Sequence, residues 1–197
     1  MNIDTSHPAV LPCIVGFFVL LREGSLLITK FTQMNTVKRA DRSTLSSIWI
    51  TILLSLFVAS PFPFLREQME TLAFPLSRNG VIAVFGVLIA GISLRWWAIH
   101  CLGRFFTVNV AVHSNHKVIN TGPYMLLRHP SYTGLLLEFL ALALAYQNLI
   151  SLMIIMVPST YIMLRRIRHE ERVLKRALGE PYRVYLKKTY SLLPFVY

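Results

Sequence analysis

The sequence predicts an all-α, polytopic membrane protein with about five transmembrane helices, a polar cytoplasmic loop and a C-terminal helix. Its 197 residues are 54% hydrophobic with a mean hydropathy of +0.54, whereas only 15% are charged. The apolar residues occur in separate blocks, and a helix needs about 20 of them to cross a bilayer. The net charge of +11 lies between and after these blocks, which is typical of membrane topology and argues against nucleic-acid binding.

Three apolar blocks make up the first half of the chain. They cover residues 8–29, 45–65 and 80–94. The first block is interrupted by Arg22 and Glu23 and is followed by a basic polar stretch. The third block ends at Arg95-Trp96-Trp97, where charged and aromatic residues are typical of a membrane interface. We expect three spans in this half.

Two further blocks, 131–146 and 149–164, are separated by only Gln147-Asn148 and predict a tight helical hairpin. The strongly basic tail that follows keeps helical spacing up to Gly179-Glu180-Pro181, a sequence that stops a helix. Five spans place the termini on opposite sides of the membrane. The loop after the first block, the polar segment 103–130 and the tail share one side, and their Lys and Arg content assigns that side to the cytoplasm.

Polar side chains flank this hairpin at both of its cytoplasmic ends. Folding the hairpin brings His129 and Tyr132 at its start close to Arg166 and Glu171 at its exit, near the membrane surface. Convergent polar groups beside apolar surface predict a binding site. Each feature also has a simpler interpretation, because Pro130 alone is a normal helix start and basic residues alone can lie among lipid headgroups.

The chain resembles isoprenylcysteine carboxyl methyltransferases over roughly residues 100–197. The resemblance rests on the run from His116 through Tyr124, Arg-His-Pro-Ser-Tyr at 128–132, Arg166 with Glu170-Glu171, the Gly179…Tyr182…Tyr185 spacing and Leu193-Pro194-Phe195. It implies an integral membrane, multi-pass methyltransferase that uses S-adenosyl-L-methionine, with its active site on the cytoplasmic side. It also implies a single membrane-embedded domain over 1–197, with three spans in 1–100 and the cofactor loop, hairpin and amphipathic C-terminal helix in 101–197.

The same resemblance assigns roles to individual residues. The cofactor-binding set that it implies is His116, Lys117, Val118, Ile119, Tyr124, His129, Pro130, Ser131, Tyr132 and Glu171. Arg166 matches the arginine that would meet the carboxylate of the acceptor. The implied partners are a lipophilic small-molecule or prenylated substrate and membrane lipid.

The residues themselves are compatible with methyl transfer. A carboxylate acceptor is already ionised at neutral pH and needs no general base, whereas an amine acceptor would need His129 or Glu138 as its base. The chain has no GxGxxG, so a cofactor site must be built from the loop and the helix ends. Cys13 and Cys101 form no CxxC and indicate neither a disulfide nor a metal site.

Three alternatives remain at this point. Phospholipid N-methyltransferases, which methylate phosphatidylethanolamine, share a similar C-terminal pattern. A non-catalytic membrane protein could use the basic tail to bind anionic lipid. A membrane reductase with a nicotinamide cofactor could carry a similar Arg-His-Pro helix start. Glu138, inside the fourth block, belongs to no recognised motif, although a carboxyl group at that depth is costly and usually functional.

Overall fold

The computed structural model describes residues 9–31, 43–61, 70–106 and 118–193. Within these ranges the chain is helical, with two isolated β-bridges and no strand. The long helices are α1 (Val10–Phe31), α2 (Ser43–Ala59), α3 (Arg78–Leu102), α4 (Pro130–Ala145) and α5 (Leu149–Leu178), followed by the short α6 (Glu180–Lys188). Three single-turn 3₁₀ helices are η2 (Glu70–Leu72), η3 (Gly103–Phe105) and η4 (Gly122–Met125). The all-helical prediction is therefore confirmed.

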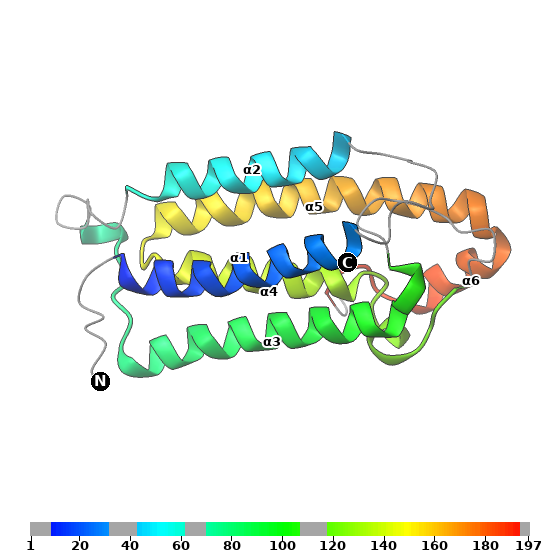
Figure 1. The fold of residues 1–197 in the computed structure, drawn as a ribbon, viewed down its shortest axis with the longest axis horizontal. Coiled ribbons are helices and arrows are strands. Elements are labelled where there is room, and N and C mark those ends of the chain that lie inside the picture. The colour runs from blue at the N-terminus through cyan, green and yellow to red at the C-terminus, as the bar shows by residue number, and fades with distance from the viewer. Residues whose placement is uncertain (1–8, 32–42, 62–69, 107–117, 194–197) are drawn as a thin grey trace.

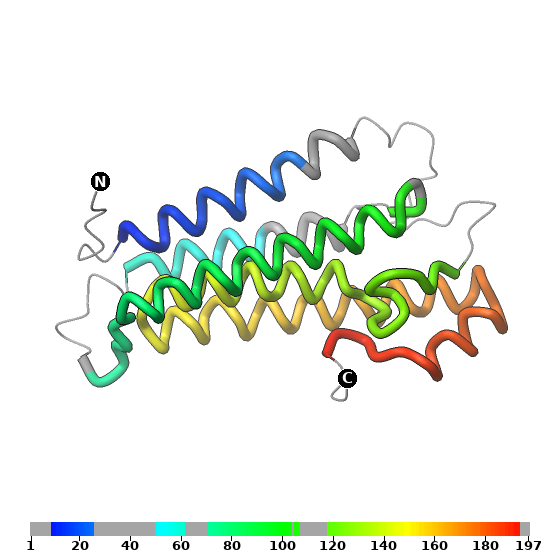
Figure 2. The backbone as a smooth tube through the Cα atoms, turned by 90° about the horizontal axis from the view of Figure 1, so that it is seen from below, coloured from blue at the N-terminus to red at the C-terminus, as the bar shows by residue number. Residues whose placement is uncertain are grey.

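The five long helices lie side by side in one elongated bundle, with α4 at its centre (Figures 1 and 2). α4 packs against α1, α3 and α5, while α2 packs against the outer side of α5. Consistent with this position, α4 buries most of its side chains, among them Leu135, Phe139 and Leu142. The helix whose start carries the predicted site is thus held on several sides by the other helices.

The outward faces of the bundle are apolar. Large hydrophobic side chains that point outward include Phe17, Leu21, Phe57, Ile82, Ile89, Met153 and Val157. Phe57 is 76% exposed, which would be unfavourable in water but is expected of a lipid-facing surface. Among the described residues, α3 and α5 are the two helices that are both long and apolar enough to cross a membrane. The number of five spans stays a prediction.

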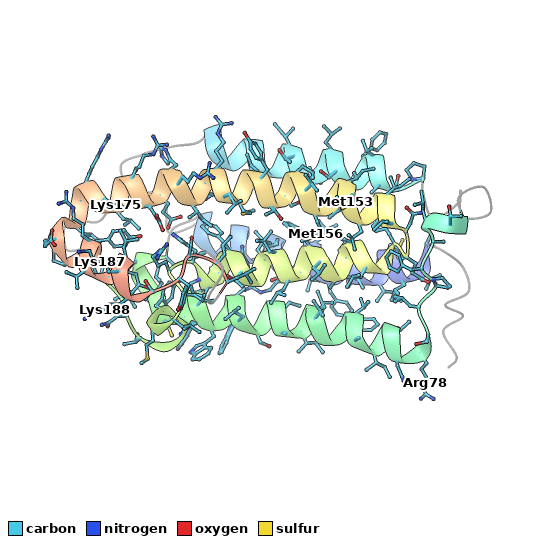
Figure 3. The ribbon with its side chains drawn as sticks, turned by 180° about the vertical axis from the view of Figure 1, so that it is seen from behind. Arg78, Met153, Met156, Lys175, Lys187 and Lys188 are labelled. Carbon is cyan, nitrogen blue, oxygen red and sulfur yellow. The ribbon has the colours of Figure 1, made fainter. Side chains whose placement is uncertain are left out.

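The segments that we expect in the cytoplasm start from one end of the bundle. α1, α3 and α5 finish at this end and α2 and α4 begin there (Figure 1). Lys175, Lys187 and Lys188 gather at the same end, opposite Arg78 at the far end (Figure 3). The basic tail therefore lies at the same end of the bundle as the points where α1 and α3 finish and where α2 and α4 begin.

The predicted end of the third apolar block differs from the structure. The block does not end at an interfacial Arg95, because α3 continues to Leu102 and Arg95 is only 7% exposed. Arg95 can be buried because Glu23 of α1 is also buried and forms an ion pair with it. The first block is confirmed as one helix, since Arg22 and Glu23 lie inside α1, which runs from Val10 to Phe31.

α5 is longer than the predicted span 149–164 and runs without a break into the basic tail. Its 30 residues extend over about 45 Å at the rise of an α-helix, whereas the hydrocarbon core of a bilayer is about 30 Å thick. The polar second half of α5, which begins at Arg165, therefore lies beyond the apolar part of the bundle. The helix ends as predicted before Gly179, whose φ of 61° lets the chain turn back into α6.

Glycine allows the closest approach in the bundle, between α3 and α4. A Cβ atom on Gly134 would lie 2.7 Å from the carbonyl oxygen of Gly91 and 2.8 Å from the backbone nitrogen of Arg95. Backbone atoms cannot move aside, so Gly134→Ala is expected to separate the two helices and lower the stability by about 1–3 kcal/mol. Thermal unfolding of the purified protein in detergent measures this effect.

Gly86→Ala is the matched control for this prediction. Gly86 lies in α3, the helix that packs against α4, and a Cβ atom there would meet nothing within 4 Å. Alanine is the better helix former, so this variant should unfold at or slightly above the wild-type temperature. Equal melting temperatures for the Gly134→Ala and Gly86→Ala variants would contradict the proposed close packing of α3 and α4.

Candidate active site

The start of α4 is fixed by the end of the chain. The backbone N–H of Arg128 donates to the carbonyl of Tyr190 at 2.7 Å, and that of His129 donates to Ser191 at 3.1 Å. The N–H of Tyr190 donates in return to Leu126 at 2.9 Å, so the two segments pair as a short parallel bridge. α6 thus leads the chain back from the tip of α5 to cover the first residues of α4.

Tyr132, in the first turn of α4, connects the two ends of the hairpin. The Nε of Arg166 donates a hydrogen bond of 2.6 Å to its hydroxyl oxygen, and the hydroxyl donates to Oε2 of Glu170 at 2.8 Å. The ring of His129 stacks on that of Tyr132 with a centroid distance of 5.7 Å. Arg166 is only 4% exposed although it carries a charge. The prediction that the hairpin brings these residues together is therefore confirmed.

Glu171 is the second point of connection between α5 and the start of α4. Its Oε1 accepts a 2.8 Å hydrogen bond from Nε of Arg128 and lies 3.4 Å from Nε2 of His129. Nζ of Lys175 is 3.9 Å from Oε2. Burial alone would raise the pKa of Glu171, but the hydrogen bond with His129 and the charge of Arg128 together hold it below its usual value. Glu171 is consequently ionised at neutral pH.

Tyrosine rings surround the two glutamates. Tyr124 in η4 is 6% exposed, and Tyr182 in α6 is 4% exposed. Burial, followed by the neighbouring carboxylates of Glu170 or Glu171, raises the pKa of both phenols. They are neutral at physiological pH and offer aromatic faces next to negative charge, an environment that suits an organic cation.

The remaining predicted cofactor residues are placed as follows. His116 and Lys117 lie outside the described residues. Val118 and Ile119 are half-buried in the segment that leads to η4. Pro130 is the first residue of α4 and is buried, as expected of a helix-initiating proline.

Ser131 differs from the rest of the predicted set in the direction that it faces. Its carbonyl and hydroxyl oxygens accept hydrogen bonds from Arg95 of α3, at 2.9 and 3.1 Å. It therefore faces α3, whereas the neighbouring Tyr132 contacts α5.

Several residues of the site have no assigned role in the sequence analysis. Arg128 binds Glu171 and also donates from Nη1 to the carbonyl oxygens of Leu186 and Thr189, which anchors the end of α6. The Tyr185 hydroxyl donates to the carbonyl of Tyr124 at 2.8 Å. In the sequence, the position of Arg128 directly before His129 was the one signal that it belongs to the site. The partners of Arg128 are more than 40 positions away along the chain, so only the fold reveals them.

Comparison with known proteins identifies the family of the chain. Residues 82–176 match the model of the isoprenylcysteine carboxyl methyltransferase family. Protein-S-isoprenylcysteine O-methyltransferase B of Arabidopsis thaliana is 33% identical over 162 residues, which cover 80% of this chain and 81% of that protein. The chain belongs to the isoprenylcysteine carboxyl methyltransferase family. The A protein of the same plant is 30% identical over 174 residues, 86% of this chain and 87% of its own length.

The fold agrees with this family. The solved structure of the eukaryotic intramembrane Ras methyltransferase ICMT superimposes with a TM-score of 0.60, at 23% sequence identity over 90% of this chain. The present chain corresponds to 63% of the length of that protein. As a member of the isoprenylcysteine carboxyl methyltransferase family, the chain is a membrane methyltransferase, and the matched residues include α4 and nearly all of α5.

Proposed function

We propose that this protein transfers a methyl group from S-adenosyl-L-methionine to the carboxylate of an isoprenylcysteine or a similar lipophilic acid. The observation that carries the proposal is the position of Arg166. This arginine is nearly buried, yet it lies where the apolar part of α5 ends, and Tyr132 fixes the direction of its guanidinium group. A guanidinium group held in this way is suited to orient a carboxylate that arrives from the lipid phase.

The cofactor fits the residues on the same side of α4. S-adenosyl-L-methionine has an ammonium and a sulfonium group, and both cations suit a site with the ionised Glu171, Glu170 and tyrosine rings. We propose that Tyr124, His129, Pro130, Tyr132 and Glu171 contribute to this site, and that the segment 116–119 covers the adenosine. Ser131 faces Arg95 of α3 and is left out of the proposed site. When bound, the cofactor supplies the methyl group, which passes from its sulfur to a carboxylate oxygen of the acceptor while the electron pair of the broken bond stays on sulfur.

The residues of the chain provide alignment for this reaction. No proton has to be removed from a carboxylate acceptor, so no general base is required. Arg166 holds the acceptor, Tyr132 holds Arg166, and the packed helices exclude water from the acceptor side. Glu138 is not suited as a base for an amine acceptor, because it lies six residues after Tyr132 in α4 and is fully buried in the bundle.

The placement in the membrane follows from the same arrangement. We propose that the five long helices all cross the bilayer as one domain, with the basic ends of the bundle and the active site on the cytoplasmic side. The water-soluble cofactor then enters from the cytoplasm beside α6. The prenyl or other lipid chain of the acceptor enters from the bilayer along the apolar helices, so the two reactants meet at the membrane surface.

Methyl transfer to a small isoprenylcysteine tests this function. Purified protein in detergent is incubated with S-adenosylmethionine labelled in its methyl group and with N-acetyl-S-farnesylcysteine. We expect a labelled methyl ester, which alkali cleaves to labelled methanol. N-acetylcysteine without the prenyl chain is the matched control and should remain unlabelled.

Phosphatidylethanolamine in the same assay separates the alternative enzyme. An N-methylated headgroup keeps its label in alkali, because a C–N bond is not hydrolysed as an ester is. Alkali-stable label in phosphatidylethanolamine, with none in the farnesylcysteine, would replace our proposal by phospholipid N-methylation. If neither acceptor is labelled and the protein has no affinity for S-adenosylhomocysteine, the results would favour the third alternative, a non-catalytic membrane protein that binds lipid.

A further inference from the structure

A buried ion pair joins α1 to α3 close to the start of α4. Nε of Arg95 donates to Oε1 of Glu23 at 2.8 Å, and its Nη2 donates to Oε2 at 2.7 Å, so the pair is bidentate. The two side chains are only 8% and 6% exposed. Burying two charges is costly, and a pair is maintained inside a bundle of this kind when its geometry is good and its remaining donors are satisfied.

The third nitrogen of Arg95 extends this pair to α4. Its Nη1 donates to the carbonyl oxygen of Ser131 at 2.9 Å and to the hydroxyl oxygen at 3.1 Å. Ser131 directly precedes Tyr132, the residue that holds Arg166. Glu23 thus fixes Arg95, and Arg95 fixes the first turn of α4 from the side opposite to the hairpin.

The close contact of two glycines makes this reach possible. Gly91 and Gly134 bring the backbones of α3 and α4 together, and Arg95 and Ser131 each lie about one turn from these glycines towards the cytoplasmic end. At that separation the guanidinium group bonds directly to the main chain of the first turn. A longer distance between the helices would require a water molecule or a different residue.

Two further ionisable side chains belong to the cluster but do not orient Arg95. Arg22 and Glu138 lie close enough to Arg95 and Glu23 to interact with them electrostatically. Glu138 is fully buried, and its two carboxyl oxygens accept no hydrogen bond from the described residues. The hydrogen bonds that orient Arg95 from α1 therefore come from Glu23.

We propose that Arg95, oriented by Glu23, is a positioning residue for methyl transfer, which holds the first turn of α4 so that His129 and Tyr132 meet Glu171 and Arg166. This inference rests on the proposed function. It gives the N-terminal helix α1 a part in the active site, although α1 carries none of the motifs of the site. Binding of the cofactor would then require a first turn that Arg95 has already ordered.

The double variant Glu23→Gln/Arg95→Met tests the inference, because it removes the two opposite charges of the pair together and leaves the net charge unchanged. Arg95→Lys is the conservative variant, which keeps the charge but loses the planar set of donors that reaches Glu23 and Ser131 together. We expect the double variant to fold and to show faster hydrogen exchange at the amides of Tyr132 and Thr133, which bond to the His129 carbonyl in the wild type. The exchange rates of these amides in Arg95→Lys should lie between those of the wild type and those of the double variant.

The kinetic readout separates positioning from general damage. A first turn that is ordered only part of the time lowers the apparent affinity for the cofactor, so KM for S-adenosylmethionine should rise about tenfold in the double variant. At saturating cofactor, kcat should stay within about threefold of the wild type. Two control variants should leave KM unchanged. Glu138→Gln alters the carboxyl group of the same cluster, and Val84→Ala makes a cavity in the buried face of α3.

Unchanged exchange at Tyr132 and Thr133 in the double variant overturns the inference, whatever the activity. An equal rise of KM in Val84→Ala also overturns it, because the effect would then come from loss of stability alone. Failure of the proposed function is recognised separately. In that case the wild type neither binds S-adenosylhomocysteine nor transfers methyl, while hydrogen exchange still reports on the first turn of α4.

Discussion

Replacing Glu171 with alanine is expected to weaken the binding of S-adenosylhomocysteine at least about 100-fold, because the half-buried, ionised carboxylate that we propose as the partner of the cofactor ammonium is lost. The same substitution leaves Arg128 without the carboxylate that it binds at 2.8 Å, so the start of α4 loses part of its support. Isothermal titration calorimetry of the purified protein in detergent measures the dissociation constant directly.

Two further variants make this result specific. Glu171→Gln keeps an oxygen acceptor for Arg128 but removes the charge, and its loss of affinity should be about tenfold. Glu180→Ala removes an acid whose side chain is 70% exposed at the start of α6, and this variant should bind as the wild type does. Wild-type affinity in both Glu171 variants would remove Glu171 from the proposed cofactor site.

Arg166→Lys is expected to lower kcat/KM for the farnesylcysteine acceptor about 100-fold. Lysine keeps the positive charge, but it cannot both donate to the Tyr132 hydroxyl and present a planar pair of donors to a carboxylate. The measurement is the initial rate of methyl ester formation at varied acceptor concentration.

Arg165→Lys is the matched control for Arg166. Arg165 is the preceding residue in α5 and is exposed, so its substitution should leave the rate unchanged. The affinity of Arg166→Lys for S-adenosylhomocysteine should remain within about threefold of the wild type, which shows that the fold is intact. A normal rate in Arg166→Lys would mean that another group meets the acceptor.

The residues that the sequence analysis could predict are those joined by local rules. The hairpin follows from two apolar blocks separated by two residues, and helices of similar length in such a hairpin must return to the same end. The predicted blocks 131–146 and 149–164 have the same length, so this rule places His129 and Tyr132 near Arg166 and Glu171, as the structure confirms, although α5 itself continues to Leu178. The end of α5 at Gly179 follows in the same way from glycine and the proline at position 181.

Other parts of the site depend on contacts that no local rule fixes. Glu23 and Arg95 are 72 positions apart, and the sequence favours an interfacial position for Arg95 beside two tryptophans. The hydrogen bond from Tyr190 to Leu126 likewise joins the segment after α6 to the segment between η4 and α4. Their partners are known only when the order in which the helices pack is known.

The sequence by itself determined an all-helical membrane chain and the family to which it belongs. Hydrophobic block length determines the first property and the order and spacing of the motifs determine the second, since both can be read along the chain. The tertiary structure alone decided that α4 lies at the centre and that α1 supports it through Glu23 and Arg95. A buried charge is stable only beside its partner, and the partner is chosen by helix packing, which the order of residues along the chain does not specify.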